Sequence, residues 1–389
     1  MNDFFALLSA LPKPPDFRWD WTALNRSILK RFFEGMARAQ QHPSFHGEGD
    51  AWSHTQMVCE TLAAFPAFRA LPERQRQEVA LAALLHDIGK IPCTKLEDGR
   101  WTSPGHSTAG AHMARETLWT EYGLCGTPEK QNIRETICQL IRWHMSPVRI
   151  IEQEDAERRL IRTASMAQLA PDFSIALLCM LSEADVLGRI ADDIAECAEQ
   201  VQLCREMAQE ADCLHQPAPF ASPVTQHAYL NGKSVWPQQA LYDDAWGEVI
   251  LLCGLPGTGK DTWIAQNCSH LPTVSLDDLR RSMGVAPTDN QGPVVQAAME
   301  QARIHLRAHQ PFVWNATCLT PLNRQKQLRL FEQYGAKTRI VYLETGWEEN
   351  LRRNHERRYA VPEHVIGRML GSLIPPERHE AQAVEWQCT

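Results

Sequence analysis

The seven residues Leu84-Leu85-His86-Asp87-Ile88-Gly89-Lys90 are the most informative stretch of this 389-residue chain. The apolar run that leads up to them from Val79 is typical of a helix buried on nearly all sides. His86, Asp87 and Lys90 follow at a helical spacing that lets all three face one cavity. An imidazole and a carboxylate in an apolar setting need a partner, and a divalent cation accepts both as ligands. For this pair alone, a core histidine beside a surface aspartate is the alternative.

The composition is that of a soluble globular protein, with 44% hydrophobic and 22% charged residues. The formal net charge of -8 gives no sign of general nucleic-acid binding. The twelve cysteines are scattered without a Cys-x-x-Cys pair, which favours a reducing compartment over a zinc ribbon or a disulfide framework. No signal peptide and no apolar run of membrane-spanning length is recognisable. We therefore expect a cytoplasmic protein with no membrane partner.

The pattern of helix-forming and strand-forming residues changes along the chain, which predicts a multidomain protein. Residues 1–215 are predicted to form an all-α domain, with helices at 21–41, 52–70, 73–89, 107–122, 128–144, 156–168 and 173–214. Residues 216–246 are rich in proline and are interpreted as a linker. Between 247 and 389, the apolar runs 248–253, 311–314 and 338–343 alternate with helix-forming stretches, and a further strand is expected to end near Ser275. This alternation predicts an α/β domain with a parallel sheet.

More histidines and a second aspartate surround the first motif. His54 stands at a predicted helix start, and His106 follows a Ser-Pro-Gly turn. His144 comes after Arg-Trp, and Asp185 lies in the stretch Glu-Ala-Asp-Val-Leu-Gly-Arg that ends at Arg189. The order His…His-Asp…His…His…Asp resembles the HD-domain phosphohydrolase superfamily from His54 to Arg189.

This resemblance implies a metal-dependent phosphohydrolase with two ions. The first ion would be bound by His54, His86, Asp87 and Asp185. His106 and His144 would bind the second ion and share Asp87 with the first, and Lys90 would contact a substrate phosphate oxygen. Such a metal pair activates water and neutralises developing charge. The mixed ligand set favours a transition metal such as Mn, Ni, Co, Zn or Fe over magnesium alone.

The other polar residues near this set have plainer interpretations. His42, His46 and His112 are interpreted as surface or packing histidines, although the loop that starts at His46 is a candidate edge of the substrate entrance. Arg189 could support the metal site, contact a phosphate or simply be a solvated helix residue.

A second group of candidate site residues lies near the start of the C-terminal domain. The stretch Gly254-Leu-Pro-Gly257-Thr258-Gly259-Lys260 follows a predicted strand and opens a predicted helix, which is the context that a phosphate-binding loop requires. Its glycines let backbone N–H groups approach phosphate oxygens, and Lys260 would reach the terminal phosphates of ATP or another NTP.

One position departs from the usual phosphate-binding loop. Asp261 stands after the lysine, where Ser or Thr normally coordinates Mg²⁺. Asp261 could itself be a ligand or hold a metal-bound water, or Thr262 could take over this role. The sequence therefore leaves open which residue coordinates Mg²⁺. The prediction of a phosphate-binding site does not change.

Charged residues beyond the loop complete this group. Asp277 lies just after a predicted strand end, where ligands of parallel sheets bind. Arg353 and Arg357 are predicted four apart on a helix and could clamp phosphates as a lid, or form an ordinary solvated face. The loop, Ser-x-Asp-Asp-x-x-Arg and the Arg-x-x-x-Arg lid resemble the polynucleotide 5′-kinase branch of P-loop kinases. The resemblance implies Asp277 as general base, Arg280 on the acceptor's phosphate, and both lid arginines on the nucleotide.

Together the two parts resemble the bacterial HD-Pnk end-healing enzymes. The implied function is a bifunctional enzyme that removes 2′-phosphate, 3′-phosphate or 2′,3′-cyclic phosphate ends and phosphorylates 5′-OH ends of RNA or DNA, upstream of a nucleic-acid ligase. The alternatives are an HD nucleotidase or alarmone hydrolase, or a nucleotide-sensing HD module, fused to a small-molecule kinase. The oligomeric state is left open, with a homodimer as one option.

Overall fold

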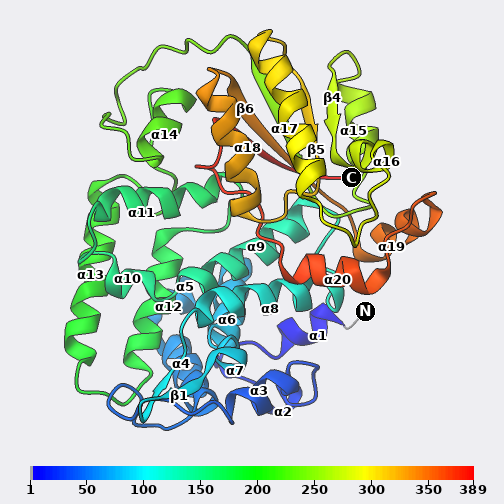
Figure 1. The fold of residues 1–389 in the computed structure, drawn as a ribbon. Coiled ribbons are helices and arrows are strands. Elements are labelled where there is room, and N and C mark those ends of the chain that lie inside the picture. The colour runs from blue at the N-terminus through cyan, green and yellow to red at the C-terminus, as the bar shows by residue number, and fades with distance from the viewer. Residues whose placement is uncertain (1–2) are drawn as a thin grey trace. The chain divides into compact units, whose positions relative to one another are not determined.

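The computed structural model describes residues 3–389, which divide into two compact units (Figure 1). The first unit extends to Ala218 except for Cys125–Pro128, which group with the second unit, Pro219–Thr389. The second unit therefore takes in most of the predicted linker, residues 216–246, and that segment contains helix α14 (Pro223–Leu230). Each unit is described below by itself.

The first unit is almost entirely helical. Its helices are α1 (Phe4–Ser9), α2 (Trp21–Leu24), α3 (Lys30–Met36), α4 (Ala51–Ala64), α5 (Pro66–Ala70), α6 (Glu73–Leu85), α7 (Lys90–Cys93), α8 (His106–Thr120), α9 (Pro128–Trp143), α10 (Ser146–Arg149), α11 (Ala156–Ala164), the 3-10 helix η1 (Ser165–Gln168), α12 (Ile175–Leu187) and α13 (Ile194–Glu210). A small antiparallel hairpin, β1 (Lys95–Glu97) with β2 (Arg100–Thr102), follows α7. The all-α class predicted for this part of the chain is confirmed.

Helix α6 lies at the centre of this unit, packed against α4 and α12. Every residue from Val79 to Leu85 is fully buried, as the apolar run predicted. The α-helix ends at Leu85, so His86 caps it, and Asp87 lies in a tight turn before α7. The turn is closed by a hydrogen bond from the Lys90 N–H to the Asp87 carbonyl at 2.9 Å. The motif is therefore not one continuous α-helix, yet it still brings Lys90 beside Asp87.

Gly89 allows the start of α8 to approach this turn. A Cβ at Gly89 would lie 1.9 Å from the carbonyl oxygen of His106 and 2.4 Å from the amide nitrogen of Gly110. No side chain fits such a space, because both neighbours are backbone atoms of a helix. The absence of a side chain at Gly89 therefore sets how closely His106 can approach Asp87.

A buried ion-pair network holds α8 against α9. Arg115 on α8 donates to both carboxylate oxygens of Glu135 on α9, and Arg134 donates to Glu135 at 2.8 Å. Burial raises the pKa of Glu135, but Arg115 and Arg134 lower it to about 2, so this carboxylate stays charged. Losing one member of such a buried network costs about 3–5 kcal/mol. The network thus fixes the two helices that carry His106 and lead to His144.

The second unit is built on a five-stranded parallel sheet. After α14 its elements are β3 (Glu248–Cys253), α15 (Lys260–Asn267), β4 (Thr273–Ser275), α16 (Leu276–Ser282), α17 (Gly292–Arg307), β5 (Val313–Asn315), α18 (Pro321–Gln333), β6 (Lys337–Glu344), α19 (Trp347–Glu356), α20 (Glu363–Gly371) and β7 (Ala383–Cys388). The strand order is β4-β5-β3-β6-β7, with all neighbours parallel. The predicted α/β class with a parallel sheet is confirmed.

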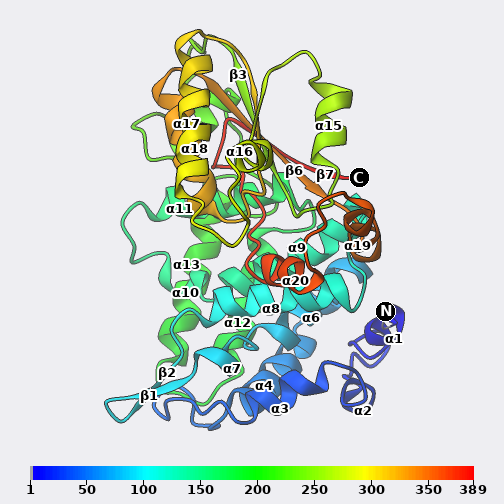
Figure 2. The same ribbon diagram turned by 45° about the vertical axis from the view of Figure 1, so that its right-hand side comes forward.

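Both faces of this sheet are covered, as continuous apolar strands require. Figure 2 shows α15 on one side of the strands and α17 and α18 on the other. One face packs Ile250 and Leu252 of β3 against Trp263 of α15. On the other face Phe331 of α18 lies near Trp314 of β5, with ring centroids 6.0 Å apart. Strand β3 lies in the middle, so its carboxyl end opens where the chain order reverses, the position at which such sheets bind ligands.

Several predicted elements differ from the structure. The predicted helices 21–41, 52–70, 156–168 and 173–214 are each broken in two, the last around Gly188. A Cβ at Gly188 would lie 2.6 Å from the Cα of Val58, so the chain turns away there. The hairpin β1–β2 and the edge strand β7 were not predicted. The hairpin strands have only three residues each, and a strand that short shows no usable period.

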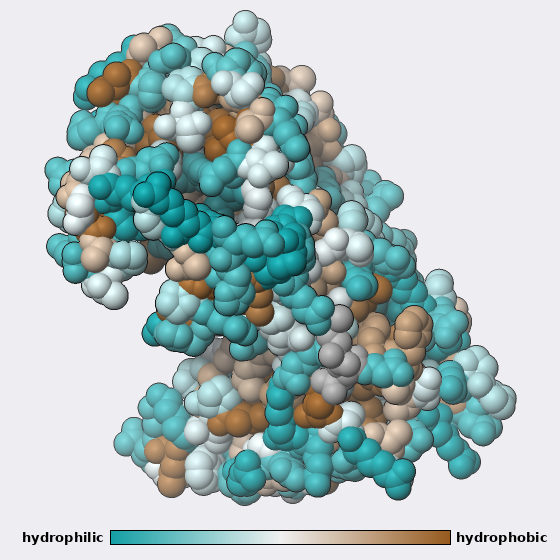
Figure 3. Space-filling view, turned by 90° about the vertical axis from the view of Figure 1, so that its right-hand side faces the viewer, coloured by the Kyte–Doolittle hydropathy of each residue, from teal (hydrophilic) through white to brown (hydrophobic). Residues whose placement is uncertain are grey.

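Most of the cysteines are buried inside the protein. Figure 3 shows a mostly hydrophilic face with scattered hydrophobic patches. Among residues 3–389, no helix is both long and apolar enough to cross a membrane. All twelve cysteines lie in the described part of the chain, none forms a disulfide, and nine are buried.

Replacing Gly89 should destabilise the first unit. We expect Gly89→Ala to lower its free energy of unfolding by about 3 kcal/mol, because the new methyl group overlaps backbone atoms that cannot move independently. Urea unfolding followed by circular dichroism measures this. Gly367→Ala in α20 is the control, since nothing lies within 4 Å of its added Cβ, and it should be neutral or slightly stabilising. Equal stability of the two variants would contradict the close approach.

Candidate functional site

The structure brings all six predicted metal ligands together in the first unit. His54 lies on α4 and Asp185 on α12, while His86, Asp87, His106 and His144 lie at the ends of α6, α8 and α9. Possible ligand atoms of His54, His86 and Asp87 lie within 4.8 Å of one another, as do those of Asp87, His106 and His144. Asp185 joins the first group, with Oδ1 at 2.8 Å from His54 Nε2 and 3.7 Å from His86 Nε2. Asp87 is the member common to both groups.

Three of the four histidines have the same fixed tautomer. Nδ1 of His86, His106 and His144 each lies within 2.6–2.9 Å of the carbonyl oxygen of the residue three positions earlier. A carbonyl only accepts, so each Nδ1 must carry a proton, which leaves Nε2 as the nitrogen that can bind a metal. These bonds orient the rings, which is how metal-binding histidines are usually held.

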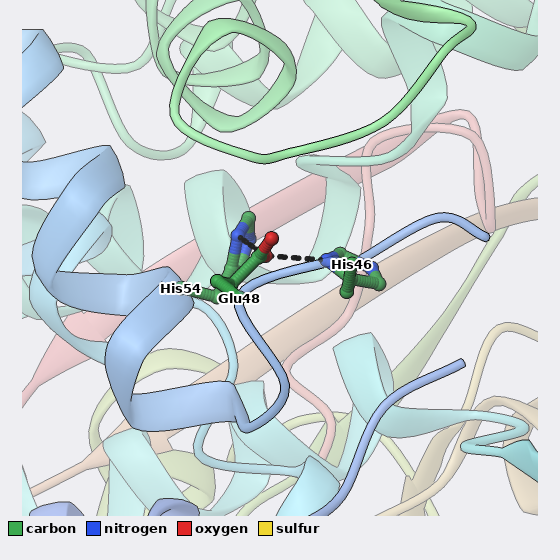
Figure 4. Close-up of side chains that lie close together, drawn as sticks. All are labelled: His46, Glu48 and His54. Atoms are coloured by element: carbon green, nitrogen blue, oxygen red, sulfur yellow. Dashed lines mark hydrogen bonds and ion pairs between the residues drawn. The ribbon is translucent and has the colours of Figure 1, made fainter. Parts of the chain in front are cut away.

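His54 is held differently, by two carboxylates. Its Nε2 faces Asp185 at 2.8 Å, and its Nδ1 lies 2.9 Å from Oε1 of Glu48. Figure 4 shows Glu48 between His54 and His46, whose Nδ1 is also 2.9 Å from Oε1. Oε2 of Glu48 accepts the backbone N–H of Ile190 at 2.9 Å. Glu48 therefore connects the loop before α4 to the segment after α12, and it orients His54.

The charge states of Asp87 and His144 suit a cation, whereas His54 must lose a proton before it can be a ligand. Burial raises the pKa of Asp87, but Lys90 and His86 hold it well below its usual value, so this carboxylate is ionised. Burial, together with the nearby His86, lowers the pKa of His144 to about 3, so this ring is neutral. Burial lowers the pKa of His54, yet the hydrogen bonds to Asp185 and Glu48 raise it to about 9.

The residues fit a divalent metal ion. Nε2 of His86 and Oδ1 of Asp87 are buried and have no hydrogen-bond partner among residues 3–389. Leaving two such atoms unpaired is costly, and a cation would satisfy both at once. Lys90 is also buried, with Nζ at 2.7 Å from Asp87 Oδ2, and it donates to Oε1 of Gln41. The lysine predicted to contact phosphate thus borders the ligand set.

The phosphate-binding loop joins β3 to α15 in the second unit. Gly254, Gly257 and Gly259 all have positive φ, and a Cβ at Gly254 would lie 2.4 Å from the carbonyl oxygen of Leu343. Thr258 is buried, and its hydroxyl donates to the Leu255 carbonyl. Nζ of Lys260 is folded onto the loop, donating to the carbonyls of Gly254 and Leu255 at 2.9 and 2.8 Å.

Asp261 pairs with a strand end rather than with the loop. Its Oδ1 accepts from Nδ2 of Asn315, the last residue of β5, at 2.7 Å. Thr262 lies exposed in the same first turn of α15. Asp261 therefore directs a carboxylate toward the carboxyl end of the sheet, where a magnesium ion with a bound nucleotide would require oxygen ligands.

The predicted base and lid residues gather near this loop. Oδ1 of Asp277 on α16 accepts a hydrogen bond from Nη1 of Arg280 at 2.6 Å. Its Oδ2 lies 4.0 Å from Nη2 of Arg357. A Cβ at Gly259 would be 3.5 Å from Nη1 of Arg353, so this arginine borders the loop. The prediction that the two lid arginines share one helix is wrong. Helix α19 ends at Glu356, and Arg357 continues with an extended backbone that turns its side chain toward Asp277.

Sequence reasoning missed Glu48 and Gln41 as members of the first site. A weak signal existed for Glu48, since the loop His-Gly-Glu-Gly-Asp ends at Asp50, which caps α4 with its side chain. Gln41 had no sequence signal. Arg189, another predicted candidate, makes local hydrogen bonds. Its Nη2 donates to Asp193 at 2.7 Å and to Cys197 at 3.2 Å, both at the start of α13.

Two protein families match the two units. Residues 52–189 match the HD domain family, and residues 249–376 match a family described as an AAA domain. The chain therefore carries an N-terminal helical HD domain and a C-terminal parallel α/β P-loop domain.

Similarity to individual proteins is partial. A multifunctional CCA protein of Halorhodospira halophila is 32% identical over 114 residues, which are 29% of this chain and 23% of that protein. The chain thus spans less than a quarter of the length of this relative. A solved gluconokinase from Sinorhizobium meliloti is 23% identical, with a TM-score of 0.27, over 36% of this chain and 82% of that protein.

Removing the Glu48 carboxylate should weaken metal binding. We expect Glu48→Ala to reduce Mn²⁺ affinity by about 10–100-fold, because His54 loses the acceptor that orients its ring. Isothermal titration of the metal-free protein measures this, with a melting curve to check folding. Glu34→Ala on α3 removes an exposed carboxylate and should bind Mn²⁺ like the wild type. Unchanged affinity in Glu48→Ala would show that His54 needs no such support.

Nucleotide affinity should fall at alkaline pH. Burial and Arg357 lower the pKa of Lys260 to about 8, so without nucleotide its ammonium loses its charge as the pH rises through that value. We expect the Kd for ATP to rise by up to about tenfold between pH 8 and pH 9. Fluorescence anisotropy with a labelled nucleotide measures it. In Lys260→Arg the guanidinium stays charged, and the Kd should be flat over this range. Parallel profiles would rule out Lys260 as the titrating group.

Proposed function

We propose that this chain is a bifunctional end-healing enzyme for RNA or DNA. Its HD domain would remove 2′-phosphate, 3′-phosphate or 2′,3′-cyclic phosphate ends, and its P-loop domain would phosphorylate 5′-OH ends with an NTP and Mg²⁺. The observation that supports the proposal is that one chain carries both an HD domain with a His/Asp cluster and a P-loop domain. The His/Asp cluster suits removal of a phosphoryl group, and the P-loop with Asp277 suits its addition.

In the HD domain, the protein residues would bind and orient. His54, His86, Asp87 and Asp185 would hold one divalent ion, and His106 and His144 would hold a second with Asp87 shared. Bound ions would supply Lewis acidity and an activated water. Lys90 would donate to a phosphate oxygen, since its Nζ already lies 2.7 Å from Asp87. The rings of His86, His106 and His144 would need no reorientation to bind metal, because their Nδ1–H groups are already fixed on carbonyls.

In the P-loop domain, Asp277 would orient and deprotonate the attacking 5′-hydroxyl. Arg280 lies 2.6 Å from this aspartate and would also contact the acceptor's own phosphate. Lys260 would leave the carbonyls of its loop to reach the transferring phosphate. Arg353 beside Gly259 and Arg357 beside Asp277 would neutralise charge on the donor and on the transferring group. Phosphoryl transfer depends mainly on such positioning and charge compensation.

The two activities are chemically complementary. A broken strand with a 5′-OH and a phosphate on its other end cannot be joined by a ligase that needs a 5′-phosphate and a 3′-OH. Removing phosphate from one end and adding it to the other converts both into the joinable form. A nucleic-acid ligase would therefore be the functional partner.

The test uses one oligonucleotide that carries a 5′-OH and a 3′-phosphate or 2′,3′-cyclic phosphate. We expect the wild type, with ATP, Mg²⁺ and Mn²⁺, to convert both ends. Asp87→Ala should lose only the phosphatase activity and Lys260→Ala only the kinase activity, each by at least about 10²-fold. Gel mobility and release of inorganic phosphate measure the two reactions.

Free nucleotides and gluconate, assayed in parallel, separate this proposal from its competitor. If the wild type leaves both oligonucleotide ends unchanged but consumes a nucleotide or phosphorylates a small molecule, the chain acts in small-molecule metabolism and the end-healing assignment is wrong. Loss of both activities in either single variant would contradict two independent sites.

A further inference from the structure

Gln41 is anchored to the backbone that starts the His54 helix. Its N–H donates to the carbonyl of Gly49 at 2.9 Å, beside a β-bridge between Gln40 and Asp50. Asp50 caps α4, which carries His54 in its first turn. The position of Gln41 relative to the metal cluster is therefore fixed by main-chain hydrogen bonds, although this segment is not part of a helix.

The orientation of the Gln41 amide follows from its neighbour. The Lys90 ammonium has only protons to offer, so the amide atom that faces it must be the oxygen Oε1. The amide nitrogen Nε2 then points elsewhere. The residue is 7% exposed, and Nε2 has no hydrogen-bond acceptor within residues 3–389. A buried N–H donor without an acceptor is costly, and an acceptor supplied by a ligand would remove that cost.

The same lysine connects this donor to the metal cluster. Lys90 Nζ lies 2.7 Å from Asp87 Oδ2, and Asp87 belongs to both groups of candidate ligands. The ammonium thus lies next to a candidate site for divalent cations, and the amide N–H₂, which is unpaired among the described residues, belongs to the side chain that contacts this ammonium. An oxyanion bound there would find cations and hydrogen-bond donors together, which is the environment that a phosphate group needs.

We propose that Gln41 is a substrate-binding residue whose Nε2 donates to a non-bridging oxygen of the phosphate bound at the HD centre, beside Lys90. This inference rests on the proposed phosphohydrolase function and adds a specific phosphate contact to it. Gln41 has two tasks in this arrangement. Its oxygen holds Lys90 in place, and its nitrogen binds the substrate directly.

The experiment separates these two tasks with a double-mutant cycle on the full chain loaded with Mn²⁺. Gln41→Met keeps the size of the side chain but removes both amide atoms, and Lys90→Met removes the ammonium. Binding of inorganic phosphate is measured by isothermal titration, and KM and kcat are measured on a 3′-phosphate oligonucleotide. We expect Gln41→Met to raise the phosphate Kd and the KM about tenfold, whether or not Lys90 is present.

Matched controls define the other outcomes. Gln40→Met changes the exposed neighbouring glutamine and should bind phosphate like the wild type. Manganese content and melting curves should be the same in all variants. If Gln41→Met has no effect in the Lys90→Met background, Gln41 acts only through the lysine and the proposed contact is wrong. An unchanged Kd in Gln41→Met alone, as expected if a water satisfies Nε2, would also overturn it.

The proposed enzymatic function can fail separately. If the wild type does not hydrolyse the oligonucleotide but its phosphate Kd still depends on Gln41 in both backgrounds, the phosphate contact stands and the end-healing function fails. If the oligonucleotide is hydrolysed with a KM that is independent of Gln41, the function stands and the contact fails.

Discussion

The candidate metal centre depends on three short hydrogen bonds from imidazole Nδ1–H groups to backbone carbonyls. In each case the carbonyl belongs to the residue three positions earlier, on the same helix end or turn that carries the histidine. The backbone of α6, the turn before α8 and the end of α9 thereby fix which ring nitrogen is available. For His86 and His144 this fits their positions after the ends of α6 and α9, where the last carbonyls have no partner within the helix. His106 instead uses the carbonyl of Ser103, which precedes α8.

In the proposed function, the two domains would bind phosphate in opposite ways. In the HD domain backbone carbonyls orient imidazole rings, which with the neighbouring carboxylates suit cations that would in turn attract an anion. In the P-loop domain the glycines open the backbone so that N–H groups would face a bound anion directly. There Lys260 is held by two carbonyls of its own loop. Nucleotide binding would therefore have to exchange these internal bonds for contacts with phosphate.

The sequence predicted the features that require a particular residue type at a particular spacing. It did not predict the contacts that depend only on the path of an irregular segment. The buried run before His86, the spacing of the histidines and the glycines of the phosphate-binding loop predicted both fold classes and the residues that gather at each site. The contributions of Glu48 and Gln41 depend on how an irregular segment folds back over α4, and no period in the sequence encodes such a path. Arg357 was misplaced for a related reason, because a helix boundary error of one residue turns its side chain toward a different neighbour. The edge strand β7 was overlooked although its residues alternate in type, since it lies far from any motif.

Strand β7 also has a practical consequence for spectroscopy. Nine of the twelve thiols are buried, and burial raises the pKa of several of them, such as Cys318 to about 12, which suppresses their reaction with maleimides. Cys388 is among the three that are partly accessible, and the next residue, Thr389, donates its hydroxyl to the Thr258 carbonyl within the phosphate-binding loop. With Cys93 and Cys197 replaced by serine, a fluorophore attached to Cys388 would sit one residue from that loop and report directly on nucleotide occupancy.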